Sequence, residues 1–321
     1  MRAVWFHRKF TRLQGGHLKH SHYFGHVAAT GDFAPRISFT EVPVSEQITE
    51  ERGELWPPGE AGYASRWCPD DTDLLFVAGM DWQYLAENGL DSLPNPIINL
   101  IQGVRHGRPG TELYDYLTKK AVRICVSQEV AESVNATGRA NGPVLAIPNG
   151  IDIDPVSPLA QVGGDRRRAV LIVGYKQPRL AREIAGRLEE AGVEHHALLE
   201  FRPRKEYLAM LFRHQVAVCL PLAEEGFYLP ALEAMASGCV VVTTDCIGNR
   251  EYVAADRNCL LADRKADLLV AAAVRALNLP RAELHRLLAG ARTTATSHSL
   301  GEERKRFHAV LHDIDSLWAS A

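Results

Sequence analysis

The sequence predicts an α/β fold made of two doubly wound domains, each with a parallel sheet between layers of helices. Short apolar runs alternate with helical patterns along the whole chain, which is typical of parallel strands joined by helices. A stretch rich in Pro, Gly and Asn at 148–168 divides the 321 residues into two halves of about 150 residues. The composition, 46% apolar and 23% charged, excludes disordered, collagen-like and coiled-coil chains.

The first half, residues 1–150, is predicted to form one domain. Its expected strands are 2–6, 35–39, 73–78, 96–101, 121–126 and 143–147. Its expected helices are 17–29, 111–119 and 127–137. The acidic segment 41–72 contains four prolines and three glycines, so we expect a long loop there.

The second half, residues 151–300, is predicted to form the other domain, and 301–321 a terminal helix that packs back towards the first. The expected strands are 169–173, 195–200, 216–220 and 239–243, with a weaker one at 258–262. The expected helices are 179–191, 203–213, 230–237, 265–278, 281–296 and 301–318. Sheets of this kind bind ligands at the carboxyl ends of their strands, so two facing domains would form a cleft.

Charge and composition restrict the partners. The formal net charge of −3 gives no reason to expect nucleic acid. That value is a cancellation, because residues 1–40 hold six Lys or Arg against one Asp, whereas 41–90 hold eleven acids against two Arg. No apolar run reaches the roughly 20 residues of a membrane span, and the N-terminus lacks the apolar core of a signal peptide. We therefore expect a cytoplasmic protein, and peripheral contact with a membrane stays open.

Six cysteines show no C-x-x-C pair, which disfavours a zinc site or a disulfide framework. Five histidines fall within the first 26 residues, and His22 and His26 are spaced to share a helix face. Without a paired Glu or Cys, this spacing is not expected to hold a metal. One hypothesis is that some of these basic side chains attract an acceptor carrying phosphate, carboxylate or sulfate; the alternative is a solvated basic face. The side chains are Arg8, Lys9, His17, Lys19 and His20.

Residues 216–244 carry the most informative pattern: a strand, a polar turn, a short helix and another strand. Pro230 suits the first helical position and Gly238 the left-handed residue that ends a helix. The free amides at the start of this helix would face the strand ends, where an anion can bind. Glu225 and Glu233 flank this helix start, and a carboxylate can accept two hydroxyl groups at once, which suits a sugar.

Glu225-Gly226-Phe227-Tyr228-Leu229-Pro230-Ala231-Leu232-Glu233 resembles the Glu-(x)7-Glu element of retaining glycosyltransferases with the GT-B fold, and of glycosyltransferase family 4 in particular. Three flanking segments resemble the same family in order and spacing. They are 126–130 (Val-Ser-Gln-Glu-Val), 144–152 (Val-Leu-Ala-Ile-Pro-Asn-Gly-Ile-Asp) and 248–261, which begins Gly-Asn-Arg-Glu-Tyr-Val.

The resemblance implies a role for each matching residue. Glu225 would contact hydroxyls of the transferred sugar, and Glu233 the ribose of the nucleotide. Backbone amides of the residues between them would meet the sugar or the diphosphate; these are Gly226, Phe227, Tyr228 and Leu229. The pair Gly15-Gly16 after the first strand would let amides approach the donor phosphates, with an ordinary turn as the alternative.

Two departures from the family pattern affect the prediction. The family has an Arg and a Lys for the diphosphate after the first strand of the second domain, where this chain has Gly174-Tyr-Lys176-Gln-Pro-Arg179. We expect Lys176 and Arg179 to substitute for them; the alternative is an exposed basic turn. Gln102 stands where family members often have a His near the sugar, and His106 follows four residues later as an acceptor-side candidate. Phe201 and Arg202 are candidates beside the nucleotide base.

The predicted function is transfer of a sugar from a nucleoside-diphosphate sugar to a hydroxyl acceptor, with retention at the anomeric carbon and Glu225 and Gln102 at the reacting sugar. Catalysis is expected to need neither a metal nor another cofactor. A nucleotide-sugar epimerase and a non-catalytic nucleotide-sugar-binding protein remain alternatives. The acceptor could be a glycan, a small molecule or a lipid-linked compound. Hydride chemistry and P-loop phosphoryl transfer are disfavoured because their glycine motifs do not occur.

Overall fold

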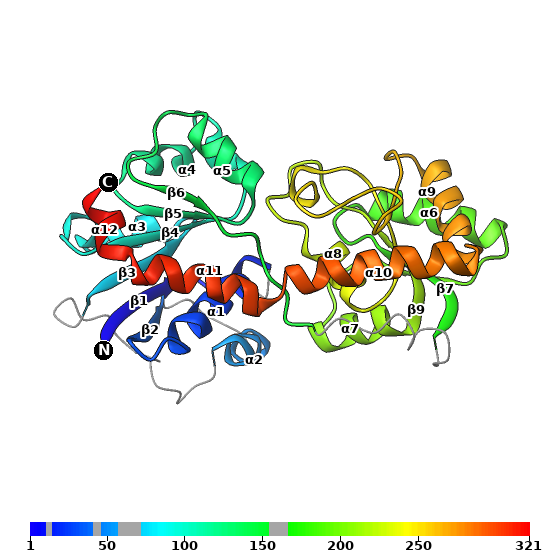
Figure 1. Cartoon of the computed structure of the whole chain (residues 1–321), viewed down its shortest axis with the longest axis horizontal. Coiled ribbons are helices and arrows are strands. Elements are labelled where there is room, and N and C mark those ends of the chain that lie inside the picture. The colour runs from blue at the N-terminus through cyan, green and yellow to red at the C-terminus, as the bar shows by residue number, and fades with distance from the viewer. Residues whose placement is uncertain (11–14, 41–45, 57–71, 154–165) are drawn as a thin grey trace. The chain divides into compact units, whose positions relative to one another are not determined.

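The structure is a computed structural model that describes residues 1–10, 15–40, 46–56, 72–153 and 166–321 (Figure 1). The chain forms two compact units, Met1–Asn149 with Glu303–Ala321 (unit 1) and Gly150–Glu302 (unit 2). The sequence had placed the corresponding boundaries at 150 and 300. Both units are α/β with parallel sheets, which confirms the predicted fold class.

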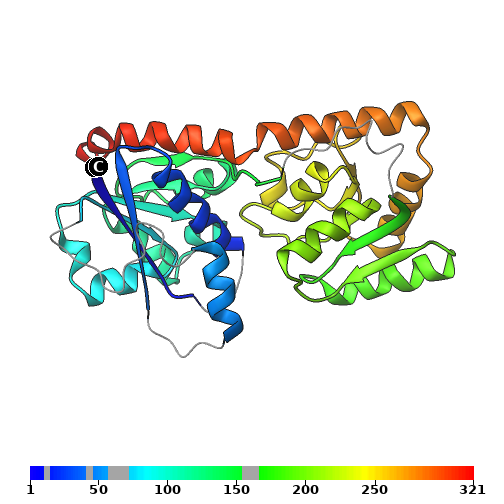
Figure 2. The same ribbon diagram turned by 90° about the horizontal axis from the view of Figure 1, so that it is seen from below.

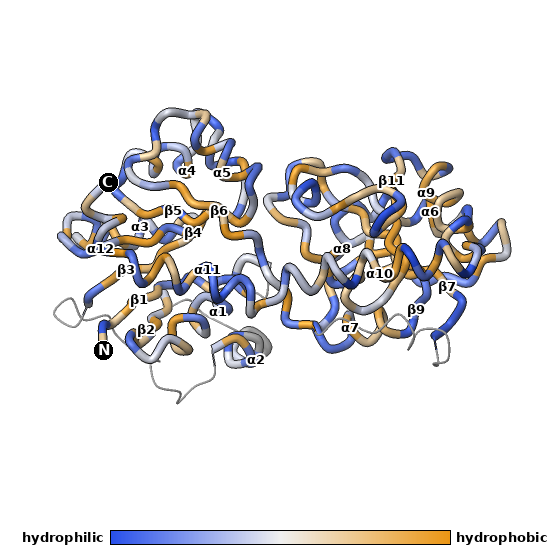
Figure 3. The backbone as a smooth tube through the Cα atoms, viewed as in Figure 1, coloured by the Kyte–Doolittle hydropathy of each residue, from blue (hydrophilic) through white to orange (hydrophobic). Residues whose placement is uncertain are grey.

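The sheet of unit 1 has six parallel strands in the order β2-β1-β3-β4-β5-β6. The strands are β1 (Arg2–Arg8), β2 (Phe33–Phe39), β3 (Leu74–Ala78), β4 (Ile97–Ile101), β5 (Val122–Cys125) and β6 (Val144–Ala146). Strands β3 and β4 are buried at every position, as expected where helices cover both faces of a parallel sheet. Figure 3 accordingly shows the strands of this sheet as largely hydrophobic.

Helices lie on both faces of this sheet (Figure 2). They are α1 (Gly15–Ala28), α2 (Glu46–Leu55), α3 (Asp81–Glu87), α4 (Glu112–Asp115), α5 (Gln128–Asn135), α11 (Leu300–His312) and α12 (Ile314–Ala319). Because side chains alternate along a strand, Trp5 packs with Trp82 of α3, and the adjacent Phe6 lies on the opposite face. There Phe6 stacks on Phe76 at 4.6 Å, beside Tyr23 of α1.

A buried charged cluster joins the last long helix to the first. Glu303 of α11 accepts hydrogen bonds from Lys19 of α1 and, at 3.0 Å, pairs with Nε2 of His26. All three side chains are almost fully buried. Burial alone would raise the pKa of Glu303, but Lys19 and His26 outweigh it and hold that pKa below its ordinary value. The ion pair with Lys19 and the hydrogen bond with His26 therefore hold α11 against α1.

The sheet of unit 2 has five parallel strands in the order β11-β10-β9-β7-β8. The strands are β7 (Arg167–Val173), β8 (His195–Leu198), β9 (His214–Cys219), β10 (Val240–Thr243) and β11 (Leu260–Leu261). The helices of this unit are α6 (Pro178–Glu190), α7 (Arg204–Arg213), α8 (Leu229–Ala236), α9 (Ala266–Leu277) and α10 (Arg281–Ser297).

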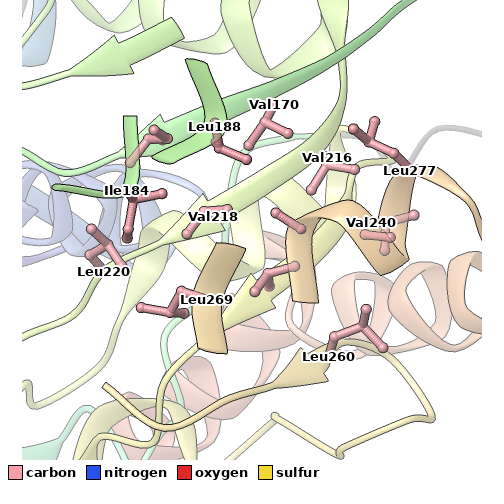
Figure 4. Close-up of a cluster of buried hydrophobic side chains, with 14 of the residues drawn as sticks. Val170, Ile184, Leu188, Val216, Val218, Leu220, Val240, Leu260, Leu269 and Leu277 are labelled. Atoms are coloured by element: carbon pink, nitrogen blue, oxygen red, sulfur yellow. The ribbon is translucent and has the colours of Figure 1, made fainter. Parts of the chain in front are cut away.

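The core of unit 2 lies between its sheet and helices α6 and α9 (Figure 4). Val170, Val218 and Val240 point from three adjacent strands towards Leu188 of α6 and Leu269 of α9. Burying one such side chain contributes about 1.5–3 kcal/mol relative to leaving it exposed. Helices α7 and α8 contact strand β9 as well, and α8 contacts β10, so both faces of this sheet are covered.

Three local predictions differ from the structure. The segment 41–72 was expected to be a loop, but it contains α2, whose polar sequence gives no apolar periodicity. The helix predicted over 301–318 is two helices, α11 and α12, separated at Asp313. The helix predicted from residue 17 begins at Gly15, so the Gly15-Gly16 pair forms the first turn of α1.

None of the helices in the described part of the chain is both long and apolar enough to cross a membrane.

His20 is a fully buried imidazole inside the aromatic cluster of unit 1. Its ring lies 5.2 Å from that of Phe6 and 5.4 Å from that of Phe76, and neither ring nitrogen has a hydrogen-bond partner among the described residues. Burial, together with the nearby Arg8, His17 and His7, lowers the pKa of His20 well below its ordinary value of 6.5. The imidazole is therefore neutral in the folded chain at neutral pH.

Replacing His20 by Leu should weaken the acid sensitivity of unit 1. As the pH falls below about 6.5, the unfolded chain binds a proton at His20 that the folded chain does not, so folding stability is lost with falling pH. At pH 5 the buried imidazole of His20 lowers the free energy of unfolding by roughly 2 kcal/mol. We expect urea titrations of His20→Leu to show a loss between pH 7 and pH 5 that is smaller by about that amount.

The four described tryptophans lie in unit 1, and the sequence of unit 2 contains none, so tryptophan fluorescence follows the unfolding of unit 1. The matched control is His312→Leu, because 89% of the His312 side chain is exposed. This variant should keep the pH dependence of the wild type. The same loss in His20→Leu as in the wild type would contradict a buried neutral imidazole at this position.

Candidate functional site

The carboxyl ends of the strands in unit 2 gather the predicted donor-side residues. In the order β8-β7-β9-β10-β11, the chain reverses its direction of travel across the sheet between β7 and β9. At such a switch point the loops diverge to opposite faces and leave a crevice that binds ligands. Lys176 follows β7 and Glu225 follows β9, so both lie beside this point.

Lys176 and Glu225 form an ion pair across the switch point. Lys176 Nζ lies 2.7 Å from Glu225 Oε2, and the side chains are 28% and 13% exposed. Glu225 Oε1 accepts the amide of Leu222 at 3.2 Å. The ammonium also lies 5.4 Å from the centre of the Tyr228 ring, within the range of a cation–π contact. Lys176, one of the two cations predicted to bind the diphosphate, is thus paired with Glu225, the carboxylate predicted to bind the sugar.

The turn that carries Glu225 is fixed by the loop after β10. The amide of Tyr228 donates to the carbonyl of Gly248 at 2.8 Å, and that of Ile247 donates to Ala223 at 3.1 Å. A Cβ on Gly248 would lie only 2.7 Å from the carbonyl oxygen of Glu225 and 2.8 Å from the amide nitrogen of Phe227. The two backbones therefore approach each other as closely as a glycine permits.

Of the amides predicted to meet the donor, that of Tyr228 is already used by Gly248. Tyr228 and Phe227 are buried, and Leu229 is the first residue of α8 with Pro230 after it. The amides at the start of α8 point towards the same strand ends, and the helix dipole favours an anion there.

Arg204 is a functional candidate that the sequence did not single out. It is the first residue of α7, at the carboxyl end of β8, and its Nη1 lies 2.7 Å from Glu233 Oε1. Its Nη2 donates to Asp152. Burial lowers the pKa of Arg204, but the two carboxylates outweigh this effect and raise it above its ordinary value. The only sequence signal was the basic run Phe-Arg-Pro-Arg at 201–204, from which we selected Phe201 and Arg202.

Asp152 is placed by a short parallel bridge within unit 2. The amide of Ile151 donates to the carbonyl of His298 at 2.8 Å, and the amide of Leu300 donates to Ile151 at 3.0 Å. Asp152 is the next residue, so backbone hydrogen bonds hold it beside the segment 298–300.

The other donor-side candidates are more exposed. Arg179 lies on the exposed side of α6, and among the described residues it makes no ion pair or hydrogen bond. Phe201 is 62% exposed, and its ring lies 4.2 Å from that of Tyr175. Arg202 is also exposed. Burial and the two glutamates Glu233 and Glu225 raise the pKa of Tyr175, so its phenol stays neutral.

Gln102 lies in unit 1 after β4 and contacts the start of α1. Its Nε2 donates to the carbonyl of Gly16 at 3.1 Å. A Cβ on Gly16 would lie 2.8 Å from Gln102 Oε1, so a larger residue there would displace this side chain. Because the atom that a Cβ would meet is the end of a flexible side chain, a small shift of Gln102 would relieve the contact.

The four acceptor-side candidates are buried, which corrects the sequence-based hypothesis of a basic surface. Lys19 is 1% exposed and paired with Glu303, and His20 is enclosed by aromatic rings. Burial and Arg105 hold the pKa of His106 at about 4, and burial and Arg8 do the same for His17. The charges expected to attract an acceptor are therefore absent or neutralised at these four positions.

Of the other two basic residues in that hypothesis, Arg8 is paired with Asp81 at 2.8 Å and Lys9 is exposed. His22 and His26 do not come together as metal ligands, because Lys19 contacts His22 and Glu303 contacts His26. Within the described residues, no three His, Cys, Asp or Glu side chains gather in an arrangement that could hold one metal ion.

The chain is similar to known proteins both in sequence and in structure. Residues 156–279 match the family model described as glycosyl transferases group 1. The chain is 29% identical, over 272 residues, to a D-inositol 3-phosphate glycosyltransferase of Corynebacterium urealyticum, covering 79% of this chain and 62% of the relative. It is 42% identical over 84 residues to an MMP alpha-(1->4)-mannosyltransferase of Mycolicibacterium hassiacum, covering 26% of this chain and 20% of the relative. The chain thus spans less than two thirds of the length of either relative.

Two solved structures share the fold over nearly the whole chain. The HepE protein of Anabaena in complex with UDP-glucose superposes with a TM-score of 0.73 at 13% identity, covering 98% of this chain and 100% of that one. A glycosyltransferase from Rickettsia africae superposes with a TM-score of 0.74 at 11% identity, covering 98% of each chain.

Replacing Gly248 by Ala should displace the turn that carries Glu225. The added Cβ would collide with backbone atoms at 2.7 and 2.8 Å, and overpacking of this kind costs about 1–3 kcal/mol. We expect hydrogen–deuterium exchange to show faster exchange in peptides covering 222–229. Gly186→Ala is the matched control, because a Cβ at this exposed position of α6 meets nothing within 4 Å.

In the control the extra methyl group should stabilise α6 by about 0.5–1 kcal/mol and leave exchange at 222–229 unchanged. Equal exchange of this segment in the Gly248 and Gly186 variants would show that the close approach of the two loops does not hold the turn.

Proposed function

We propose that this chain, which has the GT-B fold and belongs to the glycosyl transferases group 1 family, transfers a sugar from a nucleoside-diphosphate sugar to a hydroxyl acceptor with retention of anomeric configuration. The observation that carries the proposal is the placement of Glu225, Glu233, Lys176 and the start of α8 at the switch point of unit 2. Carboxylates that can accept hydrogen bonds from sugar hydroxyls lie there beside positively charged groups that favour a diphosphate.

Each part of the donor has a matching group. Glu225 can accept two hydroxyls of the sugar, and Glu233 those of the ribose. Lys176 and the amides that begin α8 can meet the phosphate charge, and each charge-assisted hydrogen bond contributes about 1.5–3 kcal/mol. Because Lys176 and these amides can stabilise the negative charge of the diphosphate, we propose that catalysis needs no resident metal ion.

Retention fits a reaction on one face of the sugar. In this proposal the bond between the anomeric carbon and the phosphate oxygen breaks, and that oxygen takes the proton of the acceptor hydroxyl as the new glycosidic bond forms. Positive charge at Lys176 and at the start of α8 would stabilise the leaving diphosphate. Gln102 cannot transfer a proton at neutral pH, so we assign it to positioning of the Gly16 turn rather than to acid–base chemistry.

The relatives indicate which compounds to test first. The name of one relative gives D-inositol 3-phosphate as its acceptor, and one structural neighbour binds UDP-glucose. We therefore propose a polyol or its phosphate as the first acceptor class and UDP-sugars as the first donors. We also propose a cytoplasmic location, because five cysteines are buried free thiols, which favours a reducing compartment.

Nucleotide release from UDP-, GDP- and ADP-sugars, with and without inositol 3-phosphate or another polyol, tests the function. Transfer requires release that depends on acceptor and a product with the anomeric configuration of the donor, which proton NMR detects. An epimerase would release little nucleotide and change the sugar. A binding protein would bind the nucleotide and do neither.

Replacing Glu225 by Gln should reduce transfer much more than nucleotide binding. Loss of one charged hydrogen bond to the reacting sugar costs about 2.7–4 kcal/mol in the transition state, so we expect kcat to fall about 100-fold or more. The Kd of the nucleoside diphosphate should not rise by more than about threefold, since the diphosphate does not contact Glu225 and Lys176 stays available to it. Glu224→Gln, a neighbouring exposed carboxylate, is the control and should keep kcat. Equal rates in the two variants would remove Glu225 from the site.

Replacing Glu233 by Gln should show the opposite pattern. Its role at the ribose predicts that the Kd of the nucleoside diphosphate rises about tenfold, which corresponds to one hydrogen bond to a charged group. Calorimetric titration measures this change. A Kd equal to that of the wild type would contradict the assignment of Glu233 to the ribose.

A further inference from the structure

Arg204 contacts two carboxylates at the carboxyl edge of unit 2. Its guanidinium bridges Glu233 of α8 and Asp152 of the segment that enters unit 2. The side chain of Glu233 is 5% exposed, and that of Arg204 is 22% exposed. A carboxylate so far from water needs a positive partner, and Arg204 supplies it.

Both glutamates of the proposed donor site are therefore held by cations. Lys176 occupies Glu225 and Arg204 occupies Glu233. A neutral hydroxyl is a weaker donor to a carboxylate than an ammonium or a guanidinium, because charge-assisted hydrogen bonds are about twice as strong. A sugar or a nucleoside alone would have to compete with these cations for the carboxylate oxygens. A cation that it displaced would lose a charged contact, and Arg204 would keep only Asp152.

A diphosphate removes this difficulty because it offers the cations a new partner. A guanidinium has five donors in a planar fork that matches phosphate as well as carboxylate. Arg204 can move Nη1 from Glu233 to a phosphate oxygen while Nη2 stays on Asp152. Glu233 is then free to accept the ribose hydroxyls at the moment when the diphosphate arrives.

We propose that Arg204, together with Lys176, receives the diphosphate of the donor, and that in the free protein it is held ready on Glu233 and Asp152. This inference rests on the proposed function and changes one of its assignments. The sequence placed the second cation at Arg179, but that side chain is exposed on α6 and has no partner among the described residues that would aim it at the strand ends. Arg204 is held by two carboxylates beside the switch point.

The exchange has a measurable consequence for specificity. The diphosphate should contribute more to binding than its own contacts, because it also releases the two glutamates for the hydroxyls. We therefore use the ratio of the Kd of a nucleoside to the Kd of its diphosphate. Losses that affect both ligands equally, such as partial unfolding, cancel in this ratio.

The experiment is calorimetric titration of the full chain with UDP, GDP and ADP, followed by the nucleoside of the base that binds. Arg204→Met should lower the ratio of the nucleoside Kd to the diphosphate Kd about tenfold to a hundredfold. A change of this size corresponds to the loss of one charged hydrogen bond to the diphosphate. Arg204→Lys keeps the charge but not the fork and should restore part of the ratio. Arg179→Met and Arg187→Met, which alter exposed positions of α6, should leave it unchanged.

A second background guards against misfolding of Arg204→Met, which leaves Glu233 buried without a partner. Glu233→Gln removes that charge, and Arg204→Met should lower the ratio in this background too. The nucleoside should bind Arg204→Met as well as or better than the wild type, because Glu233 is no longer occupied. A role of Arg204 confined to folding predicts instead that nucleoside and diphosphate binding fall together.

Three results would overturn the proposal. The first is an unchanged ratio in Arg204→Met. The second is a fall of the ratio in Arg179→Met alone, which would restore the assignment made from the sequence. The third is a parallel loss of both ligands in both backgrounds. A wild-type chain that binds no nucleoside diphosphate would overturn the proposed function itself, so the two failures are distinguishable.

Discussion

Parallel strand pairing is the constraint on which the rest of this structure depends. Each pairing between the named strands is parallel. A parallel neighbour can be reached only by a crossover, usually a helix, so helices cover both faces and every strand ends at the same edge. This geometry brings Lys176 and Glu225, 49 residues apart in the chain, to 2.7 Å from each other. The candidate site is thus a consequence of the connectivity.

Both units place a cation and a carboxylate where the strand order reverses, but the two pairs are in different states. In unit 1, Arg8 at the end of β1 pairs with Asp81 at the start of α3, and the guanidinium also donates to the carbonyl of Ala78. This pair is buried and contributes to the fold. In unit 2 the pair of Lys176 and Glu225 is more exposed and can exchange partners with a ligand. At the same topological position, the ion pair of unit 2 is thus more accessible than that of unit 1.

The sequence predicted the parts of the site that depend on neighbours in the chain. The spacing of Glu225 and Glu233 around a Pro-containing helix start placed both carboxylates at one strand end, and the structure has a helix there. It could not reveal that Arg204 meets Glu233, because the two residues are separated by 29 positions and by strand β9. It also assigned Lys19 to a basic surface, since the partner that neutralises it, Glu303, lies 284 residues away.

The sequence by itself determined the alternation of strands and helices, the parallel class of both sheets, and the helix start between Glu225 and Glu233. These features follow from periodicity and from glycine and proline, which act over a few residues. Only the tertiary structure decided which charges are paired, which histidines are buried and neutral, and which arginine lies at the switch point. Coulomb energy depends on distance through space and on burial, and neither can be counted along the chain.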